Sequence, residues 1–199
     1  NEDRAVINWM GMPNVGAEKF VERLQKTIER NFVLGVNIGK NEDTPLEEAA
    51  GDYSLASRKV HPSADYIALN VSSPNTPELR RLQQKELLDD LVWEIRRNFP
   101  SKPILLKIDP DLSFSEIDDI IAVTANYNID GIIATNTTVS RENLRSKHKD
   151  KPGGLSGLPL RERSTTIIRY IYHQTKGALP LIGVGGIFDV RDLSLIHIS

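Results

Sequence analysis

The sequence predicts an α/β fold, and more narrowly an incomplete (β/α)8 TIM barrel with about five of its strands. Short apolar, β-branched runs alternate with segments that have one apolar face, at a repeat of roughly thirty residues, which is typical of βαβ units. The apolar runs are continuous, as expected for parallel strands covered on both faces. Nearly every run ends in a cluster of polar residues, which indicates that the strand ends carry a binding site.

Five strands are expected from the apolar runs, at residues 32–38, 66–71, 104–108, 131–134 and 179–187. Five helices are expected from apolar residues at helical spacing, and Ser113 with Glu116 forms a capping box at the start of the fourth. The apolar stripes are Ala17, Phe20, Val21, Leu24 and Ile28; Leu46, Ala49, Tyr53, Ala56 and Val60; Leu88, Leu91, Val92, Ile95 and Phe99; Ile117, Ile120, Ile121 and Thr124; and Ile167, Ile168, Ile171 and Tyr172.

The polar clusters distinguish the closed barrel from the doubly wound open sheet, which shares the same alternation. An open sheet concentrates its ligand contacts at one switch point, whereas a barrel brings all strand C-termini to one site. Five clusters in succession therefore favour the barrel: residues 37–41, 70–75, 107–110, 135–138 and 183–186. The segment 139–163 has little apolar periodicity, so it is expected to be a long functional loop.

Composition narrows the possible functions. The 199 residues suffice for one domain with a substantial core, and a net charge of -2 with interspersed signs gives no reason to expect a nucleic-acid partner. The cluster of Arg80, Arg81 and Lys85 is interpreted as a solvated face. No cysteine is present, which excludes disulfides, thiolate metal sites and a cysteine nucleophile. No apolar run approaches the roughly twenty residues of a membrane-spanning helix, and no signal peptide is visible.

Individual residues at the strand ends suggest a ligand, and each also has a structural alternative. Residues 183–186 form a GxGG turn whose N–H groups could approach a phosphate, or which could simply be a tight turn. Lys107 could be a Schiff-base lysine, a phosphate ligand, a cation beside an electron-rich cofactor, or a structural lysine. The histidines lie away from strand ends, so no metal site is predicted. Asparagine amides, which suit a planar, amide-rich ligand but also shape turns, recur at Asn8, Asn37, Asn70, Asn75 and Asn136.

Five motifs together resemble the dihydroorotate dehydrogenase family. They include Asn-Val-Ser-Ser-Pro-Asn-Thr-Pro at 70–77 and Gly-Gly-Leu-Ser-Gly at 153–157, with further motifs at 34–41, 134–138 and 182–187, all in the family's order. The resemblance implies oxidation of dihydroorotate to orotate in de novo pyrimidine (UMP) synthesis, with hydride transfer to FMN. The catalytic base is cysteine in the soluble class and serine in the quinone-linked class. The matching position here is Ser73, so the resemblance is to the quinone-linked class.

The resemblance also implies a role for individual residues. Ser73 would be the catalytic base that takes a proton from the substrate carbon, with water or a neighbouring threonine as a relay. Lys107 would lie near the flavin ring, where a cation stabilises the anionic reduced form. The substrate-binding residues would be Asn8, Met10, Gly11, Asn70, Asn75, Asn136 and Thr137. The FMN-binding residues would be Asn37, Asn70, Lys107, Thr135, Gly157, Gly185 and Gly186.

Several positions depart from the family's pattern. The family's Asn-Arg-Met-Gly-Phe segment reads Asn-Trp-Met-Gly-Met at 8–12, so a cation is lost at Trp9 and an aromatic ring at Met12. This change is expected to affect substrate affinity. Asp109 stands where alanine is usual and Glu78 where glycine is usual, and both changes are expected to be tolerated at the surface.

The resemblance implies further barrel parts beyond the matched residues. Residues 1–192 are expected to be a partial FMN-binding barrel, and residues 193–199 a tail that does not match the family. The family's first two strands, with a substrate-binding lysine, its N-terminal membrane-docking helices and its last strand are not matched. The remaining sheet would have two exposed parallel edges and would be prone to self-association.

The implied partners are dihydroorotate and orotate, with quinone as the electron acceptor of the full-length protein. The implied location is peripheral, on the cytoplasmic face of a bacterial inner membrane or on the mitochondrial inner membrane, and this chain itself is expected to be soluble. Two alternatives stay open from the sequence. One is a TIM-barrel lyase that uses Lys107 as a Schiff base, and the other is an inactive fragment that binds no cofactor.

Overall fold

The computed structural model describes residues 2–27 and 31–197, and a five-stranded parallel sheet lies at its centre. The strands pair in the order β2-β3-β4-β5-β7. The five strands expected from the sequence are therefore confirmed, although those expected at 32–38 and 179–187 are shorter. Their bounds are β2 (Gly35–Ile38), β3 (Tyr66–Asn70), β4 (Ile104–Ile108), β5 (Gly131–Ala134) and β7 (Leu181–Gly183).

The expected helices are also confirmed. The Ser113 hydroxyl accepts a hydrogen bond from Glu116 N at 3.3 Å and the Glu116 carboxylate accepts one from Ser113 N at 2.7 Å, which completes the predicted capping box. Ile28 of the first stripe lies outside the described residues. The helices are α1 (Ala17–Thr27), α2 (Ala49–Val60), α3 (Lys85–Asn98), α4 (Phe114–Asn126), α5 (Arg161–Thr175) and α6 (Val190–His197), with 3-10 turns η1 (Leu46–Glu48), η2 (Leu79–Gln83) and η3 (Leu158–Leu160).

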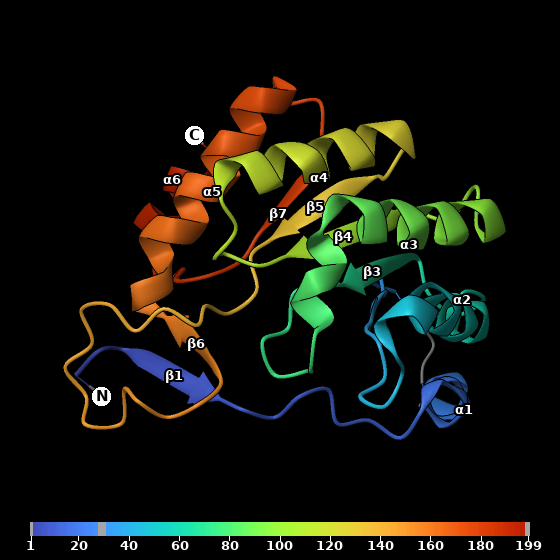
Figure 1. Cartoon of the computed structure of the whole chain (residues 1–199), viewed down its shortest axis with the longest axis horizontal. Coiled ribbons are helices and arrows are strands. Elements are labelled where there is room, and N and C mark those ends of the chain that lie inside the picture. Colours follow the sequence, from blue (N-terminus) through green and yellow to red (C-terminus); the bar gives the residue numbers. More distant parts are fainter. Residues whose placement is uncertain (1, 28–30, 198–199) are drawn as a thin grey trace.

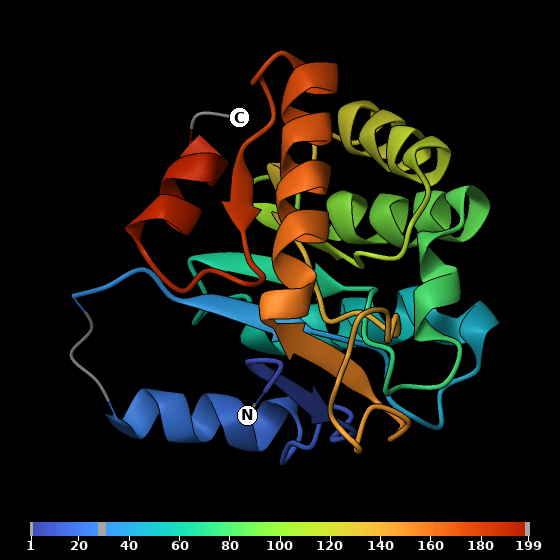
Figure 2. The ribbon, with the colours of Figure 1, turned by 90° about the vertical axis from the view of Figure 1, so that its left-hand side faces the viewer.

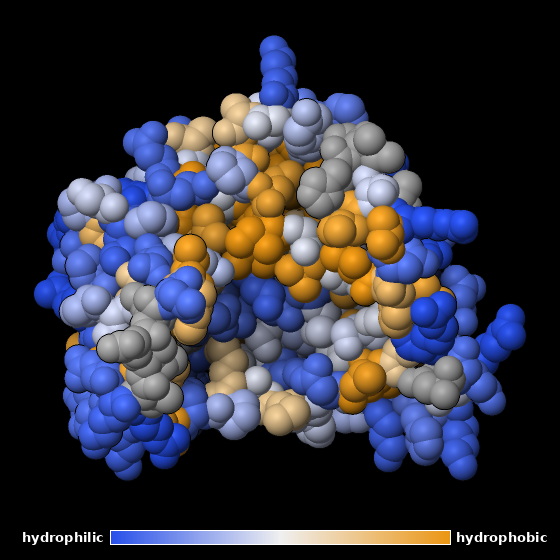
Figure 3. Space-filling view, turned by 180° about the vertical axis from the view of Figure 1, so that it is seen from behind, coloured by the Kyte–Doolittle hydropathy of each residue, from blue (hydrophilic) through white to orange (hydrophobic). Residues whose placement is uncertain are grey.

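The two faces of the sheet have different surroundings. Helices α2 to α5 form an arc along the strands (Figure 1), and the side chains that face them, such as Ile67 and Ile108, are fully buried. We call the opposite side the inner face. One row of register partners crosses it: Asn70, Lys107, Ile133 and Ile182 on β3, β4, β5 and β7. Figure 3 shows a hollowed face of the molecule with hydrophobic residues gathered in the hollow.

A second, antiparallel ribbon lies beside the main sheet and was not predicted. It pairs β1 (Ala5–Asn8) with β6 (Gly154–Gly157), and Figure 2 shows it below the strands of the main sheet. The prediction of a loop throughout 139–163 was therefore wrong, because this segment contains β6, η3 and the start of α5. Glycine is needed at Gly157, where φ is +100° and a Cβ atom would lie 2.4 Å from the Arg4 carbonyl oxygen.

The C-terminal residues that were expected to form a tail are largely helical. Residues 193–197 continue α6, and residues 198 and 199 lie outside the described part of the chain. Within residues 2–27 and 31–197, no helix is long and apolar enough to cross a membrane.

Candidate active site

The polar clusters meet at the carboxyl edge of the parallel sheet. Asn70 is the last residue of β3 and Lys107 is the penultimate residue of β4. The two are register partners. Beyond β5 and β7 the pairing continues, because Thr135 N donates to Val184 O at 2.8 Å and Val184 N donates to Ala134 O at 2.7 Å. The sheet geometry therefore brings the clusters after β3, β4, β5 and β7 to one edge, as the barrel interpretation predicted.

Three of the polar side chains at this edge are joined by hydrogen bonds. The Asn70 Oδ1 atom accepts from the Ser72 hydroxyl at 3.1 Å and from the Asn136 amide at 3.2 Å, and the Asn136 amide also lies 3.0 Å from the Ser72 hydroxyl. The Tyr53 hydroxyl, which is fully buried, donates to the Asn70 carbonyl at 2.8 Å. Burial raises the pKa of Tyr53, so this hydroxyl remains a donor. Asn70 is thus held from both its backbone and its side chain.

The ribbon contributes to the same site through Asn8. The Asn75 amide donates to the Asn8 carbonyl at 3.1 Å and to its side-chain oxygen at 3.0 Å, which docks β1 on the loop after β3. The Oδ1 atom of Asn75 is buried and has no hydrogen-bond partner within the described part of the chain. A buried acceptor without a donor is costly. This atom is therefore suited to accept a hydrogen bond from a ligand N–H group.

Ser73 lies in the loop after β3, where it is 7% exposed. Its hydroxyl oxygen accepts a 3.3 Å hydrogen bond from the Asn75 backbone N–H. No other hydrogen bond of Ser73 Oγ is found among the described residues, and no side chain is seen to accept its proton. A bound substrate or water would have to complete the proton pathway.

Lys107 is half-buried on the inner face. Its ammonium has no hydrogen-bond or ion-pair partner within residues 2–27 and 31–197, and burial lowers its pKa. A partly desolvated cation without a counter-ion favours a nearby anion or electron-rich ring. The charge of Lys107 is consequently available to a ligand at the sheet edge.

The glycine turn after β7 also matches a ligand site. Gly185 and Gly186 have φ angles of +122° and +70°, and a Cβ atom on Gly186 would lie 2.5 Å from the Arg161 Cα atom. The turn therefore requires glycine where it packs on the start of α5. No hydrogen bond found in the described part of the chain uses the N–H groups of these two glycines. The tight-turn interpretation of the GxGG sequence is therefore confirmed, and the turn leaves two N–H groups that an anion could use.

The remaining predicted residues lie at different distances from this centre. Thr135 is buried and its hydroxyl donates to the Asn136 carbonyl at 3.0 Å, while Thr137 N donates to the Asn136 side-chain oxygen at 2.8 Å. Asn37 lies on the inner face of β2. Gly11 is close to Asn75, because a Cβ atom on it would lie 3.8 Å from that carbonyl oxygen. Two residues are not brought into the network: Met10 is 70% exposed, and Gly157 lies within the ribbon.

Two departures from the family pattern have a structural explanation. Trp9 is 68% exposed, so the surface accommodates its ring without any change of packing in the core. The Met12 sulfur lies 3.7 Å from the Asn70 amide nitrogen, so a thioether occupies the space beside Asn70. Gly39 also faces Met12, since a Cβ atom there would lie 2.2 Å from its terminal methyl group.

The interpretation of Arg80 as a solvated residue was wrong, as was the surface assignment of Asp109. Arg80 Nη2 donates to the Thr137 carbonyl at 2.8 Å and its Nη1 donates to Asp111 at 2.8 Å. Asp109 is 3% exposed and accepts from the Gln83 amide at 2.7 Å. The signal was available, since two carboxylates follow β4 at the edge where the loop after β3 must pass. By contrast, the side chains of Arg81 and Lys85 are 55% and 44% exposed, as expected.

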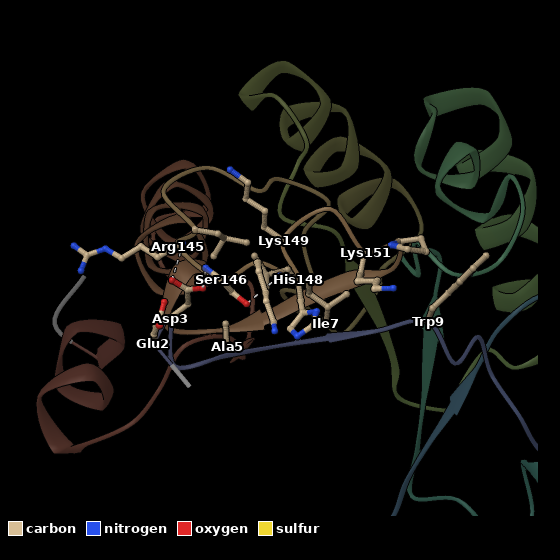
Figure 4. Close-up of a pocket in the computed structure, with 14 residues that line it drawn as sticks. Glu2, Asp3, Ala5, Ile7, Trp9, Arg145, Ser146, His148, Lys149 and Lys151 are labelled. Atoms are coloured by element: carbon tan, nitrogen blue, oxygen red, sulfur yellow. Dashed lines mark hydrogen bonds between the residues drawn. The ribbon is translucent and has the colours of Figure 1, made fainter.

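A wide cavity of about 1210 Å³ lies outside this centre, between the ribbon and the loop at residues 144–152. Ile7 and Trp9 line it from the ribbon, and none of the predicted substrate or FMN residues does. Figure 4 shows the side chains of Arg145 and Lys149 extending in different directions. These two cations therefore do not converge on one point, unlike the polar groups at the strand ends.

Comparison with known proteins adds a consistent result. The family profile for dihydroorotate dehydrogenase matches residues 1–195. A dihydroorotate dehydrogenase (quinone) from Thermosynechococcus vestitus is 48% identical over 200 residues, which cover 96% of this chain and 55% of the relative. One from Christiangramia forsetii is 47% identical over 195 residues, covering 96% of this chain and 57% of the relative. The chain thus spans about half the length of the curated relatives it matches.

Solved structures give the same picture of the fold. The crystal structure of DHODH from Eimeria tenella in complex with ferulenol superimposes with a TM-score of 0.91 at 34% identity, covering 98% of this chain and 60% of that one. The ligand-free structure from the same organism has a TM-score of 0.91 at 35% identity and covers 98% and 61%. The five parallel strands and their helices therefore correspond to part of a (β/α)8 barrel.

Proposed function

Because the chain belongs to the dihydroorotate dehydrogenase family, we propose that it forms the partial catalytic barrel of a quinone-linked dihydroorotate dehydrogenase, with residues 1–192 as the barrel portion. The full reaction oxidises dihydroorotate to orotate in de novo pyrimidine synthesis. FMN, when bound, supplies the hydride acceptor. The observation that carries this proposal is the set of asparagine amides that meet at the sheet edge beside the loop of Ser73, because it combines a serine at the base position with a binding surface for an amide-rich ring.

The amide cluster supports the choice of substrate. Dihydroorotate presents both N–H donors and carbonyl acceptors at the edge of one ring, and asparagine side chains provide both partners. Asn75 offers a buried, unpaired acceptor, and its amide group is fixed in orientation by Asn8. Asn136 is fixed in the same way by Asn70 and Ser72. The pyrimidine would therefore meet amides that are already oriented before it binds.

The residues present also fit FMN. Lys107 supplies an unpaired cation on the inner face, which would stabilise negative charge on the flavin ring. Gly185 and Gly186 supply backbone N–H donors of the kind that bind phosphate. Thr135, after β5, supplies a polar side chain between these two groups in the strand order, and Asn37 supplies another from β2, on the other side of Lys107. The site thus offers a cation for the ring and donors for the phosphate.

In the proposed mechanism, Ser73 Oγ receives the proton that leaves the substrate carbon. The N–H group of Asn75 donates to this oxygen at 3.3 Å, so it fixes the hydroxyl and leaves the hydroxyl proton directed elsewhere. A serine hydroxyl is a weak base, so its own proton must pass to water as the substrate proton arrives. Ser73 is nearly buried, which limits this transfer to a relay through the site rather than to bulk solvent.

Quinone is the proposed electron acceptor, because the curated relatives carry it in their names. A protein that reduces a lipid-soluble acceptor has to reach the membrane surface. We therefore propose a peripheral location, on the cytoplasmic face of a bacterial inner membrane or on the mitochondrial inner membrane.

The test is to mix the purified chain with FMN, remove free flavin, and record the visible spectrum before and after anaerobic addition of dihydroorotate. We expect flavin to be retained and its absorbance to bleach. Retained flavin that does not bleach would show a cofactor site without a working substrate site. Loss of all flavin would identify the chain as an inactive fragment, and trapping of substrate on Lys107 by borohydride would instead support a Schiff-base lyase.

Ser73→Ala provides the first prediction. We expect this variant to retain flavin but to reduce it at least about a hundredfold more slowly, because general-base catalysis typically contributes 10²- to 10⁴-fold. Anaerobic stopped-flow absorbance measures both quantities. Ser63→Ala, at a turn after α2, is the matched control. Loss of flavin from the Ser73 variant with unchanged reduction in the remaining holoprotein would contradict the assignment.

A further inference from the structure

We propose that Arg80 is a positioning residue that clamps the two substrate-binding loops together, residues 72–75 after β3 and residues 136–139 after β5. This inference rests on the proposed function, because it concerns the geometry in which Ser73 and Asn136 meet the same substrate. Arg80 itself touches neither Ser73 nor Asn136 through a hydrogen bond. It acts on the backbone beside each of them.

One guanidinium group reaches both loops. Arg80 Nη2 donates to the Thr137 carbonyl at 2.8 Å, and Arg80 Nε donates to the Ser72 carbonyl at 3.4 Å. These carbonyls belong to the neighbours of Asn136 and Ser73. Because the guanidinium is planar and rigid, its two bonds hold the loops at a set separation. Arg80 starts from η2, a different element from either loop, and its side chain is only 23% exposed.

Carboxylates after β4 hold the guanidinium in place. Asp111 Oδ2 accepts from Arg80 Nη1 at 2.8 Å and from Val139 N at 2.9 Å, and its other oxygen accepts from the Thr138 hydroxyl. Asp111 therefore binds the clamp and the loop after β5 at the same time. The loops after β3, β4 and β5 are in this way connected through one arginine and one aspartate.

Asp109 adds a second, buried carboxylate beneath the clamp. Its Oδ2 atom lies 3.4 Å from Arg80 Nε and accepts from Gln83 at 2.7 Å, while the Asp109 N–H donates to Gln83 Oε1 at 3.0 Å. Gln83 is itself 4% exposed and belongs to η2. Asp109 thus ties the helical turn that carries Arg80 to the end of β4. Alanine, the usual residue here in the resembling family, could make none of these side-chain bonds.

The clamp explains how a distance between two separate loops is maintained. Ser73 and Asn136 come from strands that are separated by β4 in the sheet, so no backbone pairing sets the distance between their loops directly. A displacement of about 1 Å between catalytic groups can cost roughly a hundredfold in rate. The Asn136 amide links the loops through Asn70 and Ser72, and the guanidinium of Arg80 adds a charged cross-connection between the two backbones.

Arg80→Lys tests the clamp, with Arg81→Lys as its matched control. Lysine keeps the charge but cannot reach two carbonyls and a carboxylate in one plane. In the FMN-loaded protein, we expect Arg80→Lys to lower the limiting rate of flavin reduction by dihydroorotate by roughly 10- to 100-fold while flavin remains bound. We also expect faster amide hydrogen exchange at residues 72–76 and 136–139. Arg81, which pairs with Glu78 at the surface, should give neither change when replaced.

Asp111→Asn is the second variant, in case Arg80→Lys does not fold. It keeps the side-chain shape but removes the charge that holds the guanidinium, so it should change reduction and exchange in the same direction by a smaller factor. The proposal would be overturned if Arg80→Lys and Arg81→Lys gave the same rate of flavin reduction and the same rates of amide hydrogen exchange. If the unmodified protein retains flavin but does not bleach with dihydroorotate, the proposed function fails. The exchange comparison still decides in that case whether Arg80 clamps the loops.

Discussion

At the scale of single residues, the site combines groups that are already paired with groups that are not. Asn8, Asn70 and Asn136 are held by neighbours, whereas the Asn75 Oδ1 atom and the Lys107 ammonium have no partner among the described residues. Unpaired buried polar groups reduce the stability of a fold. Their presence at one edge of the sheet is what distinguishes this region from an ordinary set of turns.

Lys107→Met tests the role of the unpaired cation, because methionine has nearly the same length without the charge. We expect flavin affinity to fall by about 10- to 100-fold, since a charge-assisted contact contributes roughly 1.5–3 kcal/mol, and the flavin reduction potential to become more negative. Thermal stability should stay equal or rise, because a partly desolvated cation is removed. Flavin titration, potentiometry and a melting curve measure these effects. An unchanged affinity together with an unchanged potential would rule out contact between Lys107 and the flavin.

Asp109→Asn tests the cost of the buried carboxylate. Burial raises the pKa of Asp109, and the nearby Arg80 opposes this shift only partly. The folded protein therefore binds this proton more tightly than the unfolded chain does, so the contribution of Asp109 to stability falls as pH rises from the ordinary aspartate range through the raised pKa. Asparagine does not titrate. The stability of the variant relative to the original protein should consequently increase with pH across that window and become constant above it.

Urea unfolding at a series of pH values measures this difference directly. A difference that stays flat, or that shrinks as pH rises, would contradict a raised pKa for Asp109. The substitution also changes two hydrogen bonds, because the Gln83 amide and the Asp111 N–H both donate to the Asp109 carboxylate.

At the scale of elements, apolar periodicity located the parallel strands and their helices well, because each buries a face that is visible in the local sequence. The ribbon was missed for a physical reason. β6 consists of Gly154–Gly157, with glycine at both ends, and its partner β1 is four residues long. β6 has no β-branched residue and β1 has only Val6 and Ile7, too short a run to indicate a strand. Contacts from distant residues also hold the ribbon, because Thr138 bridges to Leu155 and Asn75 binds Asn8.

The candidate site shows the same division. The motifs at strand ends predicted that asparagines from several strands would meet, since parallel strands share a carboxyl edge. The serine that joins Asn70 to Asn136 is Ser72, whereas, among the described residues, the Ser73 hydroxyl accepts only from the Asn75 backbone N–H. The role of Arg80 could not be read from its neighbours, because Arg80 and Arg81 look alike in the sequence. They differ only in direction: η2 turns Arg80 towards Asp111, whereas Arg81 remains at the surface.

Glu78→Gly tests backbone strain before η2. Glu78 has a φ angle of +56°, a left-handed conformation that costs an L-residue roughly 1–2 kcal/mol and that glycine adopts freely. This explains why glycine is usual at the position in the resembling family. Glycine also makes the unfolded chain more flexible, which offsets part of the relieved strain. We therefore expect the free energy of unfolding to rise by up to about 1 kcal/mol and the Tm to rise by roughly 2–4 °C.

Glu78→Ala is the matched control for this substitution. It also loses the surface ion pair with Arg81 but keeps the left-handed strain, so its Tm should not rise. Scanning calorimetry on both variants separates the two effects. A fall in Tm for the glycine variant would show that the ion pair outweighs the strain.

At the scale of the whole molecule, the inner face of the sheet is partly exposed at its edge, whereas the helix-covered face is closed. Ile182 on β7 is 41% exposed, and β2 and β7 are the two edges of the five-stranded sheet. Exposed apolar surface next to unpaired strand edges favours association between chains. We expect the isolated chain to bind a hydrophobic dye and to self-associate as its concentration rises.

Ile182→Lys places a charge on this face and should reduce both dye binding and association. Leu55→Lys is the matched control, because Leu55 is a similarly exposed apolar residue, 56% exposed, but lies on α2. Sedimentation velocity over a range of concentrations, together with dye fluorescence, provides the measurement. A chain that stays monomeric and binds no dye before any substitution would contradict this prediction.

The ribbon has a consequence for the order in which the chain folds. Val6 contacts Ser156, a partner 150 positions later in the sequence. At a synthesis rate of roughly 5–20 residues per second, β1 waits about 8–30 s on the ribosome before β6 has been made. The first four strands of the parallel sheet can assemble during that interval, whereas β7 and the turn at Gly185 and Gly186 are made only after β6. The ribbon therefore joins strands that have already been made, and the glycine turn is the last part of the candidate site to form.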